Sequence, residues 1–165
     1  MARIGTIATS ALRGHLTGAH GLPDKVGELS MASDIRLPLI TVTDILERNI
    51  ATELAEKTSG VRYPVVYVYC EKVVNDLREK FRTFSGTADL CVDIRVSHEH
   101  MDDLQPSLQA YVEAVTDVLD KKRGSWTGGV FYTGGYEIQF SPIKRGGRNF
   151  VQSAKVELTV NVSVE

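Results

Sequence analysis

The side chains best suited to chemistry lie together in the segment HEHMDD, where His98 and His100 are followed by Asp102 and Asp103. Imidazole and carboxylate groups can jointly hold zinc or iron. The segment supplies no second cluster of ligands, and a polar loop that ends in a helix cap accounts for the same residues. We predict that loop, and keep as the alternative a small metal-binding enzyme or ligand-binding domain that uses His98, His100 and Asp102.

Other patterns that indicate catalysis are missing from the sequence. No serine lies in a G-x-S-x-G turn. Cys70 and Cys91 lie inside apolar runs rather than at ligand spacing, which predicts buried free thiols of an intracellular protein. The lysine–serine pair and the helix that complete a phosphate loop do not follow the glycine pairs at 128–129, 134–135 and 146–147. We therefore predict no enzymatic activity, no cofactor and no bound metal.

The distribution of charge is more informative than any catalytic pattern. A formal net charge of −2 is unlike that of a domain that grips the phosphate backbone. Positive charge is concentrated in one glycine-bearing loop, and negative charge on one predicted helix. Opposite patches on one molecule suit a head-to-tail contact between identical subunits, and ordinary solvated surfaces are an equal alternative. The basic residues are Lys144, Arg145 and Arg148; the acidic ones are Asp102, Asp103, Glu113, Asp117 and Asp120.

The helix that carries these acidic groups, over about 102–123, is the most clearly marked element of the chain. Asp102 or Asp103 can cap its start, cations at 121–123 suit its end, and Gly124 stops it. Its apolar residues recur at helical spacing, and we expect the face they form to cover a sheet. They are Leu104, Leu108, Tyr111, Val112, Val115, Val118 and Leu119.

Two earlier segments are less regular. Residues 1–37 are rich in glycine, serine, threonine and alanine, which predicts an N-terminal arm that is either loosely held or ordered by a partner subunit. Residues 43–58 carry apolar side chains at helical spacing between a capping residue, Thr43 or Asp44, and Gly60. They predict a second helix.

The middle of the chain predicts the first strands of a sheet. Residues 65–70 form a dense β-branched and aromatic run, as in a strand with one buried face. Residues 80–84 and 88–96 alternate between apolar and polar side chains on either side of the short link 85–87. Two strands joined so closely predict an antiparallel hairpin.

The C-terminal part predicts further strands. Segments 130–133 and 136–140 flank Gly134 and Gly135, which could form a hairpin turn or a bulge in one long strand, and 141–149 reads as a loop. Residues 154–164 alternate without a break, which is long for a strand. The predicted fold is α+β, with a mostly antiparallel sheet covered on one face by the 102–123 helix.

Length and composition fit one globular domain of residues 1–165, made of the arm 1–37 and an α+β core at 38–165. The chain is 42% hydrophobic and 24% charged. No apolar run reaches the length that a bilayer requires, and the N-terminus lacks the apolar centre of a signal peptide, so we expect no membrane contact.

Between Tyr63 and Glu165 several sequence features occur together and resemble the tail terminator, or tail completion, proteins of long-tailed bacteriophages. The likeness covers about the last hundred residues, and neither the arm 1–37 nor the 43–58 helix belongs to it. It is carried by TADLCVDIRVS at 87–97, a helix with Leu108, Tyr111, Ala114, Val115 and Leu119, YEIQFSP at 136–142, GGRNF at 146–150, QSA at 152–154, and the alternating last strand.

The resemblance implies a structural virion protein of the tail and neck, assembled in the host cytoplasm. It would form a homo-oligomer, a hexameric ring, on the head-proximal end of the tail tube. There it would stop tube polymerisation and present a head–tail joining surface to the connector proteins, while DNA passes through the bore without being read. The alternative within this class is another neck component, a head–tail connector or a tail-tube-related protein.

Within such a ring we expect the loops 124–129 and 141–150 to make contacts. Trp and Arg are the residue types that most often carry interface energy. Packing in the core at a helix end is the alternative for Trp126. The candidate residues for contact with a neighbouring subunit or the tube are Trp126, Lys144, Arg145, Arg148, Asp117 and Asp120.

Overall fold

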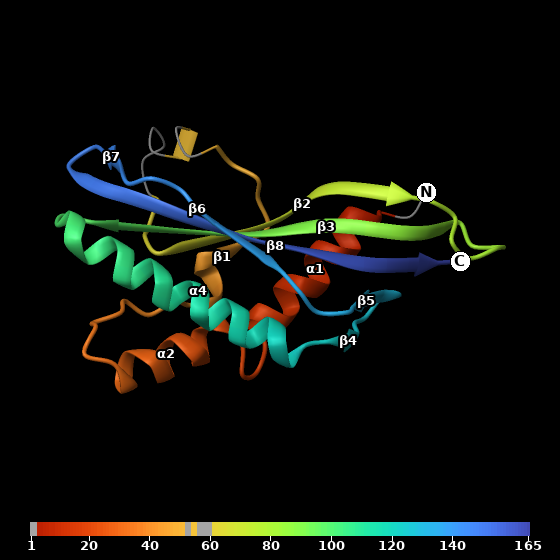
Figure 1. Ribbon diagram of the computed structural model, residues 1–165, viewed down its shortest axis with the longest axis horizontal. Coiled ribbons are helices and arrows are strands. Elements are labelled where there is room, and N and C mark those ends of the chain that lie inside the picture. The colour runs from red at the N-terminus through yellow and green to blue at the C-terminus, as the bar shows by residue number, and fades with distance from the viewer. Residues whose placement is uncertain (1–2, 52–53, 56–60) are drawn as a thin grey trace.

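The computed structural model describes residues 3–51, 54–55 and 61–165. It confirms the α+β class: an eight-stranded, mostly antiparallel sheet carries the helices α1, α2 and α4 on one face (Figure 1). The helices are α1 (Ile4–Thr17), α2 (Leu22–Ala32) and α4 (Leu104–Lys121), with 3₁₀ turns η1 (Val42–Asp44) and η2 (Met101–Asp103). The strands are β1 (Ile45–Leu46), β2 (Val65–Asn75), β3 (Phe84–His98), β4 (Gly124–Ser125), β5 (Val130–Tyr132), β6 (Glu137–Phe140), β7 (Lys144–Gly146) and β8 (Asn149–Val164).

The two longest strands, β3 and β8, form the centre of the sheet. They pair antiparallel from Phe84↔Val164 to His98↔Phe150 without a break. The strand predicted at 154–164 is confirmed, and five further residues extend it at its N-terminal end. Its apolar positions, among them Val156 and Val160, point to the helices and are buried, as the alternation requires.

Helix α4 confirms the main helix that the sequence predicts. All seven residues of its apolar face are buried against the sheet and the other helices. Its start differs in detail, because Asp103 makes no capping hydrogen bond and η2 leads directly into the helix. The Tyr111 hydroxyl donates to the carbonyl of Pro38 at 2.6 Å and so fixes the segment before β1 on α4.

The predicted N-terminal arm is wrong for the described residues, because they form α1 and α2 and contribute to the core. Leu12, Leu16 and Val26 have no exposed surface and pack in the same apolar cluster as α4 and the sheet. Five glycines lower the helix propensity of this segment. Burial of its apolar side chains in tertiary contacts outweighs that penalty.

The second helix predicted at 43–58 is also wrong over most of its described part. Residues 43–51 contain the end of η1, the strand β1 and extended chain, and only 54–55 are helical. The rest of the prediction lies outside the described residues. The apolar residues of this segment have helical spacing, but they are buried on opposite faces of the sheet. Ile45 lies in the main core, whereas Leu46 and Ile50 pack on the other face.

The hairpin predicted around the link 85–87 is wrong in its first strand and its turn, because residues 80–83 are not strand and 85–87 lie inside β3. Strand β2 continues to Asn75, β3 begins at Phe84, and the connection between them is 76–83. Gly86 lies inside β3 opposite Asn75, where a Cβ would meet the Val74 carbonyl oxygen at 1.8 Å. The glycine therefore allows a close approach of two strands rather than a turn.

The three short strands β5, β6 and β7 all pair antiparallel with β8, in that order along its length. Gly134 and Gly135 therefore lie between two strands, β5 and β6, that run in the same direction along β8. This matches the bulge alternative and not a hairpin turn. The chain then reverses at Gly147 (φ +67°), between β7 and β8, inside the predicted loop 141–149. Because β8 has neighbours on both sides, it is not an edge strand.

A smaller apolar cluster lies on the opposite face of the sheet, around Val65, Tyr67, Tyr69 and Cys91. The two cysteines are free, as predicted, with Cys91 buried and Cys70 half-buried. Burial raises the pKa of Cys91 to about 12, so this thiol stays protonated at neutral pH. In the part of the chain that the structure describes, no helix is both long and apolar enough to cross a bilayer.

Candidate interaction surfaces

The hairpin tip, defined as residues 76–83, carries the most exposed large apolar side chains of the sheet. Phe81 has a relative exposure of 102% and Leu77 of 60%. Both adopt positive φ, 65° and 48°, in the left-handed region that bulky residues seldom occupy. A conformation that is unfavourable for both residues and aims both side chains at solvent indicates a functional constraint.

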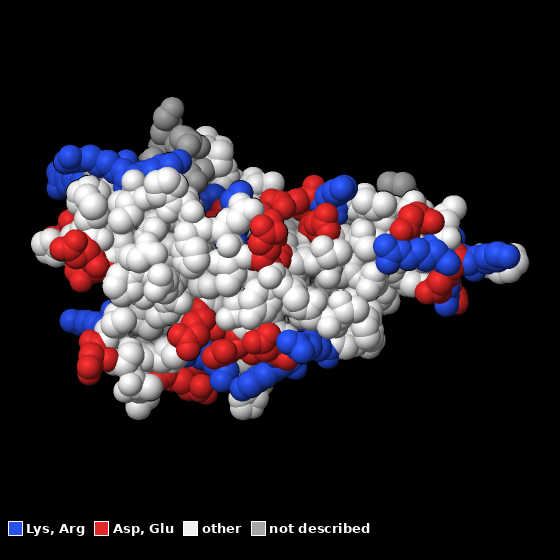
Figure 2. Space-filling view, viewed as in Figure 1, with Lys and Arg blue, Asp and Glu red and all other residues white. Residues whose placement is uncertain are grey.

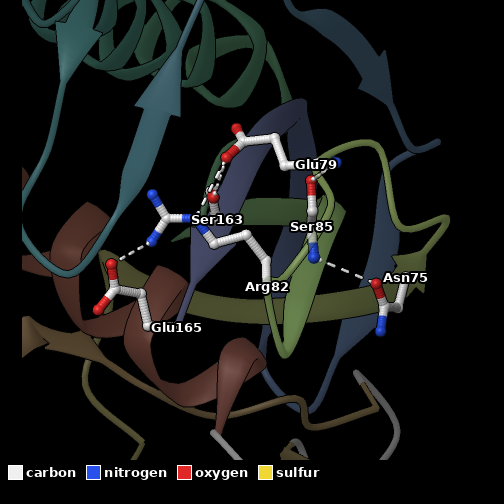
Figure 3. A network of polar contacts seen from close by, with 6 residues as sticks. All are labelled: Asn75, Glu79, Arg82, Ser85, Ser163 and Glu165. Atoms are coloured by element: carbon white, nitrogen blue, oxygen red, sulfur yellow. Dashed lines mark hydrogen bonds and ion pairs between the residues drawn. The ribbon is translucent and has the colours of Figure 1, made fainter.

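Polar contacts inside the hairpin hold this tip in one shape (Figure 3). The Asn75 Oδ1 accepts hydrogen bonds from the backbone N–H groups of Ser85 (3.1 Å) and Leu77 (3.4 Å). The Ser85 hydroxyl in turn accepts from the N–H of Glu79 at 3.0 Å. These side chains therefore replace the ladder hydrogen bonds that end where the two strands diverge.

A second set of contacts ties the tip to the end of β8. Arg82 pairs with Glu79 at 3.3 Å and with Glu165 at 2.9 Å, and the Ser163 hydroxyl donates to Glu79 at 3.0 Å (Figure 3). Arg78 donates to the side-chain oxygen of Asn161 at 3.0 Å. Contacts to a neighbouring strand make the tip an ordered surface, in which little conformational entropy remains to be lost on binding.

At the far end of β3 lies a groove of about 870 Å³, here called the distal groove. Its walls are the segment 34–39, the end of β3 and the start of α4. Apolar side chains contribute much of the lining, and Leu39 (60% exposed) and Ile35 (38%) are open to solvent. A concave site with exposed apolar groups on ordered elements can accept an apolar side chain from a partner.

The predicted basic residues lie together on the β7–β8 hairpin. Lys144 and Arg145 belong to β7, Arg148 follows in the turn, and all three side chains are exposed. Blue side chains gather at the β7 end of the molecule in Figure 2. The structure thus brings these three residues to one surface at one end of the sheet.

The predicted acidic residues Asp117 and Asp120 lie near the end of α4, away from the β7–β8 hairpin (Figure 1). Asp120 is exposed and pairs with Arg123 at 3.6 Å. Asp117 is half-buried and interacts electrostatically with Lys25 of α2. Both carboxylates therefore have cationic neighbours within the chain, which reduces their effect on a distant partner.

Trp126 is a core residue and is not exposed, as a contact with a neighbouring subunit or the tube would require. It is 6% exposed, and its ring packs against His15 and Tyr132 at centroid distances of 4.8 Å and 5.4 Å. Its indole N–H donates to the carbonyl of Lys122 at 2.6 Å. Trp126 thus packs in the core beside the C-terminal end of α4. This core position is the alternative that the sequence allows for Trp126.

The cluster of the alternative site, His98, His100 and Asp102, forms an exposed loop before α4. The His98 Nδ1 accepts from the backbone N–H of His100 at 2.9 Å and lies 3.6 Å from a carboxylate oxygen of Asp103. Within residues 3–51, 54–55 and 61–165, no group of three or more metal-ligating side chains is arranged to hold an ion. His98 and Asp103 do line the distal groove.

A group of carboxylates lies on the face of the sheet opposite α1, α2 and α4, where Glu157 of β8 is paired with Glu137 of β6. Desolvation, followed by repulsion from Glu71 and Glu137, raises the pKa of Glu157. A raised carboxyl pKa means that the folded state binds the proton more tightly than the unfolded chain. Deprotonation therefore lowers stability as the pH rises past the ordinary carboxyl range.

Glu157→Gln is expected to raise the Tm slightly at pH 7, because it removes one charge from this group and keeps the side chain's shape. Below about pH 4 the advantage should disappear, since Glu157 is then protonated in both states. Thermal unfolding of both proteins at the two pH values measures the difference. Glu113→Gln, an exposed change on α4, is the control. A lower Tm for Glu157→Gln at pH 7 would contradict the repulsion.

Comparisons with known proteins agree with this architecture, an α+β sheet that carries its helices on one face. No protein-family model matches the chain, and no curated protein sequence matches it. Among solved structures, the chain is similar to one from the "Virion of native gene transfer agent (GTA) particle", with a TM-score of 0.51 and 13% sequence identity. The alignment covers 94% of this chain and 93% of that chain. The two chains share a fold over nearly their whole lengths.

Proposed function

We propose that this protein is a structural component of a phage-like virion and acts as a tail terminator. The single observation that carries the proposal is the shared fold with a chain of a gene transfer agent virion, which extends over the N-terminal helices as well as the sheet. The sequence resemblance to tail terminators covers only the last hundred residues. The shared fold and the sequence resemblance are therefore separate observations that agree over the C-terminal part of the chain.

In this role the protein forms a ring, which we take to be hexameric, on the head-proximal end of a tail tube. The ring satisfies the exposed surface of the last tube subunits and does not offer a copy of the surface that recruits the next ones. Polymerisation therefore stops by capping, and no bond is made or broken. DNA passes through the bore, and a chain with a net charge of −2 would not retain its phosphates.

The β7–β8 hairpin is the proposed contact with the tube or a neighbouring subunit. Its residues Lys144, Arg145 and Arg148 are exposed, the first two on β7 and the third in the turn. Rim charges of this kind guide association more than they determine affinity. Asp117 and Asp120 remain proposed contacts of these basic residues on a neighbouring subunit, although cations within their own chain weaken the attraction. Trp126 supports the adjacent loop 124–129 from within the core.

Light scattering after size-exclusion chromatography tests the ring. A hexamer predicts about six times 18.2 kDa, and negative-stain electron microscopy should show particles with a central hole. A terminator should then bind purified tail tubes at one end, and loss of its gene should give overlong tails. Binding to DNA-filled heads but not to tubes would instead assign a connector. A protein that stays monomeric with tubes present would contradict both roles.

A further inference from the structure

We propose that the hairpin tip of one subunit inserts Phe81 and Leu77 into the distal groove of a second copy of this chain. This inference rests on the proposed ring and names the contact that closes it. The tip and the groove occur on the same chain, so every copy carries one of each. A partner surface for each is thus present at equal concentration whenever the protein assembles.

The tip has the properties of an anchor that is built before binding. Phe81 has no contact that shields it from water, and burial of a phenylalanine side chain is a large hydrophobic gain. The Asn75–Ser85 and Arg82–Glu165 contacts already fix the loop, so docking would order few additional groups. The positive φ of Phe81 and Leu77 has no role in packing within the subunit, because both side chains are exposed.

The groove lies where a head-to-tail contact requires it. Strand β3 runs from Phe84, next to the tip, to His98, which lines the groove, so the two surfaces lie at opposite ends of a 15-residue strand (Figure 1). At ~3.3 Å per residue this separation is roughly 45 Å. Two surfaces so far apart cannot meet within one chain. In a head-to-tail assembly, each surface is satisfied by a different neighbour.

Charge supports the same pairing. The tip carries three cations, Arg78, Lys80 and Arg82, against two carboxylates, Asp76 and Glu79. Ion pairs among the described residues engage both arginines and leave Lys80 without one. The groove lining contains two carboxylates, Asp34 and Asp103, against the single guanidinium of Arg36. A slightly positive tip thus meets a slightly negative rim, which would orient the approach of a second copy.

Contacts between two different surfaces of identical chains propagate until they close on themselves. Six copies that each turn by one sixth of a circle would form the ring proposed above. The β7–β8 hairpin lies beside the groove, because Phe150 pairs with His98 at the end of β3, but none of its residues is part of the groove lining. The subunit could therefore use one set of residues for its neighbours and another for the tube.

Three substitutions test the contact: Phe81→Asp at the tip, Leu39→Asp in the groove, and Phe140→Asp as a matched control. Phe140 is also an exposed aromatic (45%), but it lies on β6 and lines neither surface. We expect the first two variants to elute as folded monomers of 18.2 kDa and the control to assemble like the unmodified protein. Phe81→Gly should also lose assembly and keep or raise the Tm, because glycine accepts positive φ.

Mixing gives the decisive result. The Phe81→Asp chain retains its groove and the Leu39→Asp chain retains its tip, so one intact contact can form between them and none beyond it. Equimolar mixing should yield a dimer of twice 18.2 kDa and nothing larger. The double variant Phe81→Asp/Leu39→Asp should remain monomeric and should not rescue either single variant.

The inference is overturned if Phe81→Asp or Leu39→Asp assembles normally, if the two variants do not pair, or if the unmodified chain is monomeric at all concentrations. The proposed function fails differently. A ring that depends on Phe81 and Leu39 but binds neither tubes nor heads would confirm the subunit contact and reject the terminator role. A ring that caps tubes and tolerates both substitutions would confirm the terminator role and reject the subunit contact.

Discussion

Val160→Asp should abolish folding, because it places a carboxylate at the centre of the sheet. Val160 has no exposed surface, pairs with Ala88 of β3, and lies in the main apolar cluster below the helices. An unpaired charge there loses its hydration and gains no partner, at a cost of several kcal/mol. That cost is comparable with the whole stability of a typical domain, about 5–15 kcal/mol.

Soluble yield and circular dichroism measure this result. Asn161→Asp is the matched control, since its side chain lies on the opposite face of β8 and accepts a hydrogen bond from Arg78 that a carboxylate preserves. The control should fold normally. A soluble Val160→Asp protein with unchanged unfolding would mean that β8 is not the buried centre of the sheet.

Arg95→Met should cost about 3–5 kcal/mol of stability, the range for breaking a buried ion pair by removal of one partner. Arg95 and Asp93 are 3% and 2% exposed, and their side chains meet at 2.9 Å on the face of the sheet opposite α1, α2 and α4. The guanidinium also donates to the carbonyl of Ile50 and stacks over Tyr67, 4.6 Å from the ring centre. The substitution would leave the Asp93 carboxylate buried without its cation.

Urea unfolding of the double variant Asp93→Asn/Arg95→Met separates charge from packing. With the carboxylate neutralised, part of the loss should be recovered, because the uncompensated charge is gone while the altered packing remains. Equal instability of the single and double variants would show that Arg95 acts through its contacts with Ile50 and Tyr67. A loss below about 1 kcal/mol for Arg95→Met would contradict a role for the pair.

The elements that the sequence predicts correctly are those whose pattern is long and whose two faces differ. The apolar face of α4 and the alternation of β8 each extend over many residues, so one interpretation fits far better than its rivals. The segment 43–58 lacks such a difference between two faces. Its apolar residues suggest a helix only if they share one side, and here Ile45 and Leu46 are buried on opposite faces of the sheet.

The interaction surfaces were only partly predictable. Lys144, Arg145 and Arg148 lie on one exposed hairpin because they are close in sequence. The alternation at 80–84 predicts a strand through Phe81, and the exposure of Phe81 and Leu77 does not follow from the sequence, since an apolar residue type does not reveal whether it faces water. The distal groove combines segment 34–39 with the ends of β3 and α4. Only tertiary structure brings such distant residues together.

The position of β8 has a consequence for biosynthesis. The strand made last is inserted between β3 and the line of β5, β6 and β7, so the sheet cannot close until residues 149–164 have left the ribosome. Until then the nascent chain holds the local β2–β3 hairpin, on which α1 can pack, while the part of the sheet that β8 presents to α4 is missing. We therefore expect the chain to acquire protease resistance late in translation.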